Sequence, residues 1–295
     1  MHTFIMVFLI SDRISIEPIR KVAINLKKPL RNSIFLIGKK YYPMAIKSEE
    51  EVVMATVLNY QLSIFGKYSV EPSVEIITAL MPMLKEKSGK DFLPYIINSN
   101  QIAFPSNRIS NISNLGFTTQ DQRFNIAILN ERIDVNYNKM NELDLSLDDF
   151  CAFSTEILST IMEYFSFMSS RLAFNTRQFC DLPSFEALAE KGKELVKCIP
   201  YYNEKSLSEW SMRTNAQLEI QIKEMKEGIN VITTTSSMQD VTDRRSAVVF
   251  LIDINTLPQN MGMRFGKDTL ALFVQKISPV IGEITSDVER LITGE

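Results

Sequence analysis

The chain has 295 residues, of which 45% are hydrophobic and 23% are charged, and its net charge is −3. These fractions are ordinary for a globular protein, and the small charge argues against a nucleic-acid binder that uses the whole molecular surface. The length allows one large domain or two ordinary ones.

The charge is unevenly distributed along the sequence. Residues 1–48 hold nine basic and two acidic side chains, a net of +7, which leaves −10 for the remainder. Lys39-Lys40-Tyr41-Tyr42 places cations beside aromatic rings, as a site for phosphates and stacked bases would. The segment alternatively docks on the acidic remainder of the chain or on a second copy. The candidate partner or nucleic-acid contacts are Lys27, Lys28, Arg31, Lys39, Lys40, Tyr41 and Tyr42.

The first 122 residues are expected to mix strands, helices and a loop. Apolar runs predict strands at Phe4–Ile10, Ile14–Leu26 and Ser33–Gly38. The capping-box spacing of Ser48 and Glu51 predicts a helix over about Glu49–Phe65, and a second helix is expected over about Pro72–Lys87. The Ser- and Asn-rich segment Ser88–Gln122 is expected to be loop-like, with one strand near Gln101–Phe104.

The clearest local pattern is a hairpin at Arg123–Tyr137. If Asn130-Glu131 is a two-residue turn, alternation places six apolar side chains on one face, with three facing pairs: Ile128 with Ile133, Ile126 with Val135, and Phe124 with Tyr137. The other face carries polar side chains, among them Asn125, Arg132, Asp134 and Asn136. This hairpin is expected at the centre of a sheet, where it serves as scaffold.

Helices and strands alternate in the rest of the chain. A capping box at Ser146–Asp149 predicts a helix over about Leu147–Met168, which should cover the apolar side of the hairpin. Strands are expected at Arg171–Phe174, Ala216–Lys223, Ile229–Thr235 and Ala247–Ile254, with a turn at Glu227-Gly228. Helices are expected from Pro183 to about Lys197 and at the carboxyl end.

Together these elements predict an α+β fold in which mostly antiparallel sheet is covered by long amphipathic helices. Residues 101–168 and 216–292 each read as strands followed by a long helix, which suggests two similar sheet–helix layers. The expected division is a basic amino-terminal α/β portion, residues 1–100, and an antiparallel sheet and helix portion, residues 101–295. A single domain is the alternative.

One family resemblance follows from this order of elements. The path runs from Lys28-Pro29-Leu30, through Arg123–Tyr137 and Arg171-Leu-Ala-Phe-Asn175, to a carboxy-terminal strand and helix. It resembles a sporadically distributed, uncharacterised family of prokaryotic α+β proteins, and the resemblance covers most of the chain. The family carries no established activity, so it implies no site residues.

The sequence excludes several kinds of catalytic chemistry. His2 is the only histidine, which argues against Ser-His-Asp and Cys-His catalysis and against zinc sites that need several histidines. No glycine-rich nucleotide-binding motif occurs, and no cofactor is predicted. Three separated cysteines without a CxxC motif fit free thiols in a reducing cytoplasm. Asp240, Asp243 and Asp253 are the candidate ligands for Mg²⁺, although solvated loop and strand-end positions explain them as well.

The expected function is therefore protein–protein interaction without catalysis, in the cytoplasm and without a membrane span. The expected partners are another protein, a homo-oligomer, or both. The resemblance adds a role as a regulator, an inhibitor or a component of an antiviral defence or mobile-element system. The alternative is a nucleic-acid-binding protein or Mg²⁺-dependent nuclease that uses the basic amino-terminal segment.

Overall fold

The chain divides into two compact units, Met1–Glu49 and Glu50–Glu295. The computed structural model describes residues 54–103, 108–140, 145–195, 199–202, 204–240, 245–259 and 261–294, which all belong to the second unit. The three strands expected before residue 40 and the seven basic and aromatic contact residues lie outside the described part, as does the capping box at Ser48 and Glu51.

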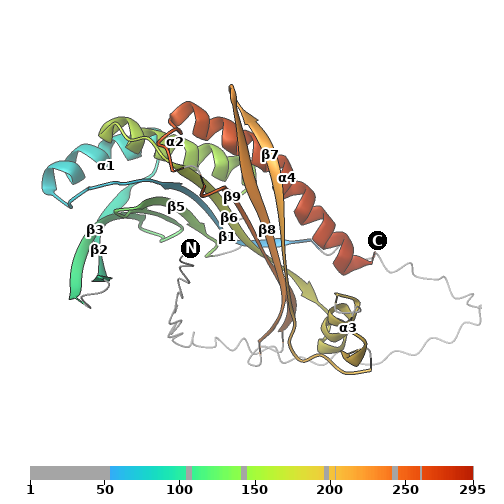
Figure 1. Ribbon diagram of the computed structural model, residues 1–295. Helices are drawn as coiled ribbons and strands as arrows, with labels where there is room; N and C mark the ends of the chain where they lie inside the picture. The colour runs from blue at the N-terminus through green and yellow to red at the C-terminus, as the bar shows by residue number, and fades with distance from the viewer. Residues whose placement is uncertain are drawn as a thin grey trace, which may run out of the picture. The chain divides into compact units, whose positions relative to one another are not determined.

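The described strands form one antiparallel sheet in the order β2-β3-β4-β5-β1-β6-β9-β8-β7 (Figure 1). The strands are β1 (Thr56–Phe65), β2 (Phe92–Ala103), β3 (Arg108–Thr119), β4 (Phe124–Ile128), β5 (Arg132–Asn138), β6 (Arg171–Leu182), β7 (Ser211–Ile222), β8 (Met225–Asp240) and β9 (Arg245–Thr256). The helices are α1 (Val74–Ser88), α2 (Leu147–Phe165), α3 (Phe185–Leu195) and α4 (Lys267–Thr293). The expected α+β class with an antiparallel sheet is confirmed.

The chain follows the same path twice within this sheet. β1 is followed by α1, a run of strands and α2, and β6 is followed by α3, a run of strands and α4. The first strand of each half pairs with the last strand of the same half, β1 with β5 and β6 with β9. β1 and β6 then pair with each other in the middle. The two segments expected to form separate layers therefore contribute strands to the same sheet, and residue 100 lies inside β2.

The predicted hairpin is confirmed in its register. β4 and β5 pair Phe124 with Tyr137, Ile126 with Val135 and Ile128 with Ile133. The backbones of Leu129 and Arg132 exchange hydrogen bonds of 2.8 and 3.4 Å across the two-residue turn. The middle strand of the sheet is β1, however, and the hairpin lies directly beside it.

Three other local predictions are wrong. Residues 56–65 form β1 and not a helix, because Tyr60, Leu62 and Ile64 are buried while the residues between them are polar, which is the period of a strand. The segment expected to be a loop, Ser88–Gln122, instead holds β2 and β3, which pair from Phe92 and Thr119 to Ala103 and Arg108. The β7–β8 turn lies at Lys223-Glu224, four residues before the turn expected at Glu227-Gly228.

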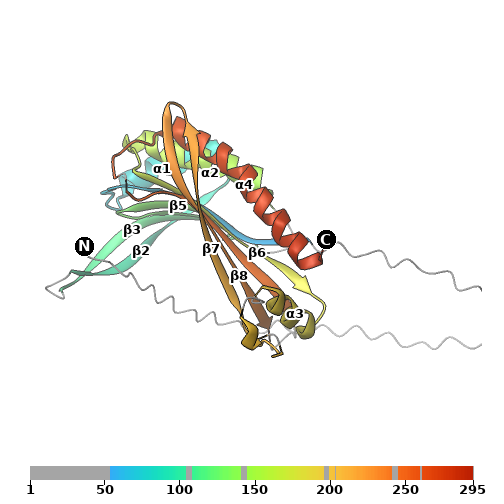
Figure 2. The same cartoon turned by 45° about the vertical axis from the view of Figure 1, so that its right-hand side comes forward.

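The helices α1 and α2 begin where side-chain caps satisfy their first backbone amides. The Ser73 hydroxyl accepts from the Ile76 amide at 3.3 Å, and the Ser146 hydroxyl accepts from the Asp149 amide at 3.0 Å. The predicted starts of these two helices are thus confirmed to within two residues. Figure 2 shows α1, α2 and α4 on one side of the sheet.

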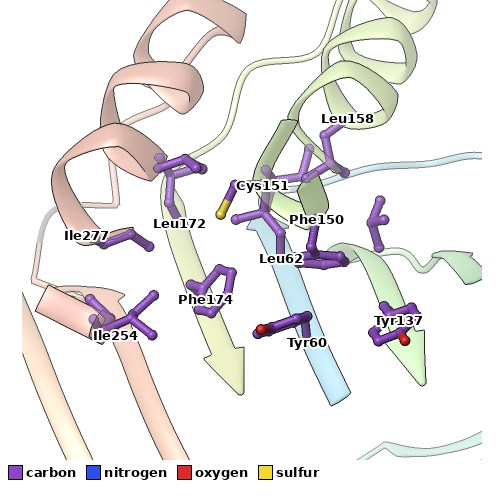
Figure 3. Close-up of a cluster of buried hydrophobic side chains, with 14 of the residues drawn as sticks. Tyr60, Leu62, Tyr137, Phe150, Cys151, Leu158, Leu172, Phe174, Ile254 and Ile277 are labelled. Carbon is purple, nitrogen blue, oxygen red and sulfur yellow. The ribbon is translucent and has the colours of Figure 1, made fainter. Parts of the chain in front are cut away.

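The main hydrophobic core lies between these helices and the sheet. Tyr60 of β1 stacks on Phe150 of α2 with ring centroids 5.2 Å apart, and Phe174 of β6 meets the same two rings at about 6 Å (6.1 and 6.0 Å). Figure 3 shows Cys151 and Leu62 beside them. Burial of this many aromatic and aliphatic side chains is the dominant stabilising term of the fold.

Candidate functional site

The candidate site is the side of the sheet opposite α1, α2 and α4, which we call the open face. Side chains on a strand alternate between faces, so each strand contributes every second residue to it. In β1 the buried residues Tyr60, Leu62 and Ile64 face the helices, and Gln61 and Ser63 face the other way. The same alternation in β6 places Asn175 and Arg177 on the open face.

A row of amide side chains crosses the middle of the open face. The register places four residues of neighbouring strands directly side by side, and we call this set the amide row: Asn125, Asn136, Gln61 and Asn175. Asp253 of β9 continues the row beyond Asn175. All five side chains are partly exposed. The row therefore offers donors and acceptors to a bound molecule across five strands.

Two amides of the row, on either side of Gln61, have no side-chain partner among the described residues. Within the described part of the chain, the side chains of Asn136 and Asn175 make no hydrogen bond, whereas Asn125 donates to the Tyr95 hydroxyl at 2.6 Å. Amides at half-exposed positions keep their water in the free protein and exchange it for a ligand at little net cost when the ligand matches them.

Asp134 lies two residues along β5 from Asn136 of the amide row, on the same face, and is almost fully buried, with 3% of its surface exposed. It accepts from the Ser63 hydroxyl at 2.6 Å, and its other oxygen lies 2.8 Å from Nε of Arg132. Burial raises the pKa of Asp134, and the Arg132 charge and hydrogen bonds from Ser63, Gln61 and Arg132 oppose this rise. The carboxylate thereby holds Ser63 and Gln61 in place beneath the face.

The ring of Phe65, two residues along β1 from Ser63 on the same face, lies between two guanidinium groups. Phe65 is flanked in the sheet by Arg132 and Arg171, whose guanidinium carbons lie 5.9 and 4.9 Å from the ring centroid. Arg171 also donates to the Thr256 carbonyl and to Oδ1 of Asn255, both at 3.1 Å. Burial lowers the pKa of Arg171, and Asp253 counteracts this. Both arginines are thus fixed in position.

A second set of amides extends toward β7. Asn255 donates to Asp253 at 3.0 Å, Asn230 donates to Asn255 at 3.3 Å, and Gln217 donates to Asn230 at 3.2 Å. This chain links β9, β8 and β7 and fixes the orientation of Asp253. Polar groups held in such a network lose little further freedom when a ligand binds.

A small apolar cluster, which is buried, lies at the far end of the open face. It consists of Phe179, Ala247 and Val249, with Leu58 and Met238 packed against them. Arg245 covers Phe179 at 4.5 Å and makes a two-pronged ion pair with Asp181 at 2.6 Å. Between the cluster and the amide row lies Arg177, which is exposed.

The centre of the open face is close to electrical neutrality. Arg132, Arg171 and Arg177 oppose Asp134 and Asp253, which leaves one positive charge. This differs from the net of −10 that residues 49–295 carry as a whole. The face is therefore suited to a polar, weakly charged surface more than to a polyanion.

Of the three candidate Mg²⁺ ligands, two lie in described strands. Asp253 pairs with Ile232 in the middle of β9, whereas Asp240 pairs with Arg245 at the far end of β8. Eight positions along β8 separate the two aspartates, about 27 Å at the rise of a strand. Asp243 lies outside the described residues. In the described part, no three acidic, histidine or cysteine side chains gather where they could hold a metal ion.

Only part of the open face is recognisable in the sequence. The polar side of the hairpin is visible there, but its partners are not, because they come from β1, β6 and β9. Gln61 was missed when residues 56–65 were assigned to a helix, and Asn175 was missed when the strand was ended at Phe174. The alternation of Asn59, Gln61 and Ser63 with apolar residues was the available signal.

A groove of about 680 Å³ lies on the other side of the molecule, between α2 and α4. Cys151, Thr155, Val274 and Ser278 are among its lining residues. Burial, together with the nearby Asp148, raises the pKa of Cys151 to about 12, so this thiol is not a nucleophile at neutral pH. Cys180 is likewise buried, with its pKa raised to about 12.

No family model, no curated protein and no solved structure matches the chain. None of the helices in the described ranges is both long enough and apolar enough to cross a membrane.

Proposed function

We propose that this protein is a non-catalytic binding protein that holds a protein partner on the open face, centred on the amide row. The observation that carries the proposal is the row itself: four amides from four strands at one level of the sheet, two of them without a side-chain partner among the described residues.

The composition of the open face supports a protein partner. Interfaces combine an apolar patch, arginine and a rim of hydrogen-bonding groups. Here Arg177 is the exposed arginine and the amide row supplies the donors and acceptors, whereas the nearby Phe179 cluster is buried and is not itself an exposed apolar patch. The two charged side chains nearest the middle, Arg132 and Asp134, already neutralise each other.

Preorganisation also supports the proposal. The networks around Asp134 and Asn255 hold their side chains in single arrangements before anything binds. Such a surface loses less conformational entropy on association than one built on mobile loops. The identity of the partner decides among the roles that the family resemblance implies, namely regulator, inhibitor or defence component.

The test is site-specific photo-cross-linking in extract from the native host. A photoreactive residue replaces Asn175 on the open face, and a control protein carries the same residue at Lys276, which is exposed on α4. We expect a discrete cross-linked protein from the Asn175 position and none from the Lys276 position. Equal yields from the two positions would overturn the proposal.

A second arm measures affinity for the captured partner. Asn175→Trp places a bulky side chain in the amide row and should weaken binding about tenfold or more, whereas Lys276→Trp should leave it unchanged. Loss of the cross-link after nuclease treatment would instead indicate nucleic acid. That alternative predicts salt-dependent binding to an oligonucleotide, weakened by Arg177→Ala or by Lys39→Ala with Lys40→Ala.

A further inference from the structure

The strand β7 ends the sheet on one side, and its outer edge has no neighbouring strand among those described (Figure 2). Seven consecutive residues, Arg213–Glu219, are exposed, so neither face of this stretch is covered. An uncovered edge strand is a template for another strand. At the opposite edge β2 carries Pro94, which lacks the amide needed for such pairing, whereas β7 contains no proline.

We propose that a second copy of this chain pairs with β7, antiparallel to it, around a two-fold axis at Ala216, so that the two sheets become one. In a continuous sheet with its two-fold axis perpendicular to the strands' plane, residues that oppose each other must project to the same face. Each residue therefore opposes one that differs from it by an even number, and the axis passes through a residue and not between two.

The charges of β7 select Ala216 among the available centres. With the axis there, Arg213 opposes Glu219 of the second copy, and symmetry makes this pair twice. Axes at Thr214, Asn215 or Gln217 place Arg213 opposite an amide instead. Arg213 makes no ion pair with another described residue, and Glu219 pairs only with the exposed Lys226, at 3.1 Å. Opposite charges directly across strands stabilise the pairing, and like charges destabilise it.

The same register also matches the remaining side chains. On the open face, Asn215 opposes Gln217 of the second copy. On the helix side, Met212 opposes Ile220, and Thr214 opposes Leu218, which is 44% exposed in the single chain. Eleven residues of each strand, Ser211–Gln221, then pair without overhang. The proposed interface thus combines the charge pairs with backbone hydrogen bonds and two apolar contacts.

The paired arrangement has a consequence for binding. Because the axis is perpendicular to the sheet, the open faces of both copies lie on the same side, so the dimer presents two amide rows together. The dimer itself does not depend on the proposed protein partner, because β7 lies at the margin of that face.

A charge exchange tests the register. Light scattering should give twice the mass of the 33.8 kDa chain for the wild type, with dissociation on dilution. Arg213→Glu and Glu219→Arg should each shift the protein toward monomer, since each opposes like charges, and the double variant should restore the dimer. A wild type that is monomeric throughout the dilution series would overturn the proposal, as would a dimer indifferent to both single changes.

Cross-linking tests the axis directly. Opposed residues in antiparallel strands have Cα atoms roughly 4.5–5.5 Å apart, within reach of a disulfide. Cys151 and Cys180 are buried, so Cys198 alone is first replaced by Ser. In this background, Ala216→Cys should form an intermolecular disulfide under mild oxidation, because residue 216 of one copy opposes residue 216 of the other. Thr214→Cys should not, because it opposes Leu218, while Thr214→Cys with Leu218→Cys should. Cross-linking of the Thr214→Cys single variant but not of Ala216→Cys would place the axis elsewhere and refute the register. Circular dichroism checks that each variant is folded.

Discussion

The two faces of the sheet are built from the same strands and differ in what their side chains do. Toward the helices, β1 and β6 present Leu62 and Phe174, which are fully buried. On the open face the same strands present Gln61 and Asn175, which are partly exposed and lie side by side. One face thus holds buried apolar side chains that stabilise the fold, and the other leaves polar side chains partly exposed, so substitutions one residue apart should have separable effects on stability.

The largest expected effect comes from comparing Phe174 with its neighbour Asn175. Phe174→Ala leaves a cavity among Tyr60, Phe150 and the sheet, and should lower the free energy of unfolding by about 3–5 kcal/mol. Asn175→Ala should change it by less than about 0.5 kcal/mol. Urea denaturation of both variants measures the contrast, and similar losses in the two variants would contradict the assignment of faces.

The buried ion pair on the helix side should likewise contribute more to the free energy of unfolding than the exposed ion pair on the open face. Arg264 makes a two-pronged contact with Glu227 at 2.6 and 3.1 Å, and the two side chains are only 12% and 8% exposed. Glu227→Ala leaves the arginine charge buried without this partner and should cost about 3 kcal/mol. Lys226 on the open face pairs with Glu219 in solvent, so Lys226→Ala should cost less than about 1 kcal/mol. Equal losses in urea denaturation would disprove the distinction.

A smaller loss is expected at the start of α2, on the helix side. Ser146→Ala removes the hydroxyl that caps the Asp149 amide and should cost about 1 kcal/mol. The control is Ser159→Ala inside the same helix, which should be neutral or stabilise by a few tenths of a kcal/mol. Thermal unfolding followed by circular dichroism measures both. A Ser146→Ala variant as stable as the wild type would rule out the cap.

The smallest expected effect depends on pH and concerns Asp134. Because burial raises its pKa in the folded protein above the ordinary value of 3.8, the folded state binds the proton more tightly than the unfolded state does. The wild type should therefore lose stability relative to Asp134→Asn as pH rises from 3.8 through the raised pKa, and no further above it. Denaturant titrations across this range give the difference. A difference that moves the opposite way with pH would indicate a lowered pKa.

Much of the covered face was predictable from local patterns. The hairpin register followed from the alternation over Phe124–Tyr137, and the start of α2 followed from Ser146 and Asp149. Both signals are local, because turn geometry and capping involve residues a few positions apart. β1 was mistaken for a helix because the capping-box spacing before it outweighed the alternation within it.

The open face was not predictable in the same way. The amide row depends on strand order, which places Gln61 beside Asn136 and Asn175 although they lie far apart in the sequence. Each polar residue alone reads as a solvated strand position. Only the pairing of β1 with β5 and β6 brings them to one level, and nothing local in the sequence specifies that pairing.

The central pairing of β1 with β6 also determines when the second edge of β1 can be covered during synthesis. The two strands are separated by more than one hundred residues, and each half of the chain closes on itself through β5 or β9. A nascent chain can therefore assemble the β1–β5 half while β1 still lacks its second neighbour. That edge stays unpaired until β6 has been synthesised, and such long-range closure is slow. The nascent chain therefore exposes the unpaired edge of β1, through which it can aggregate, until residues 171–182 have been synthesised.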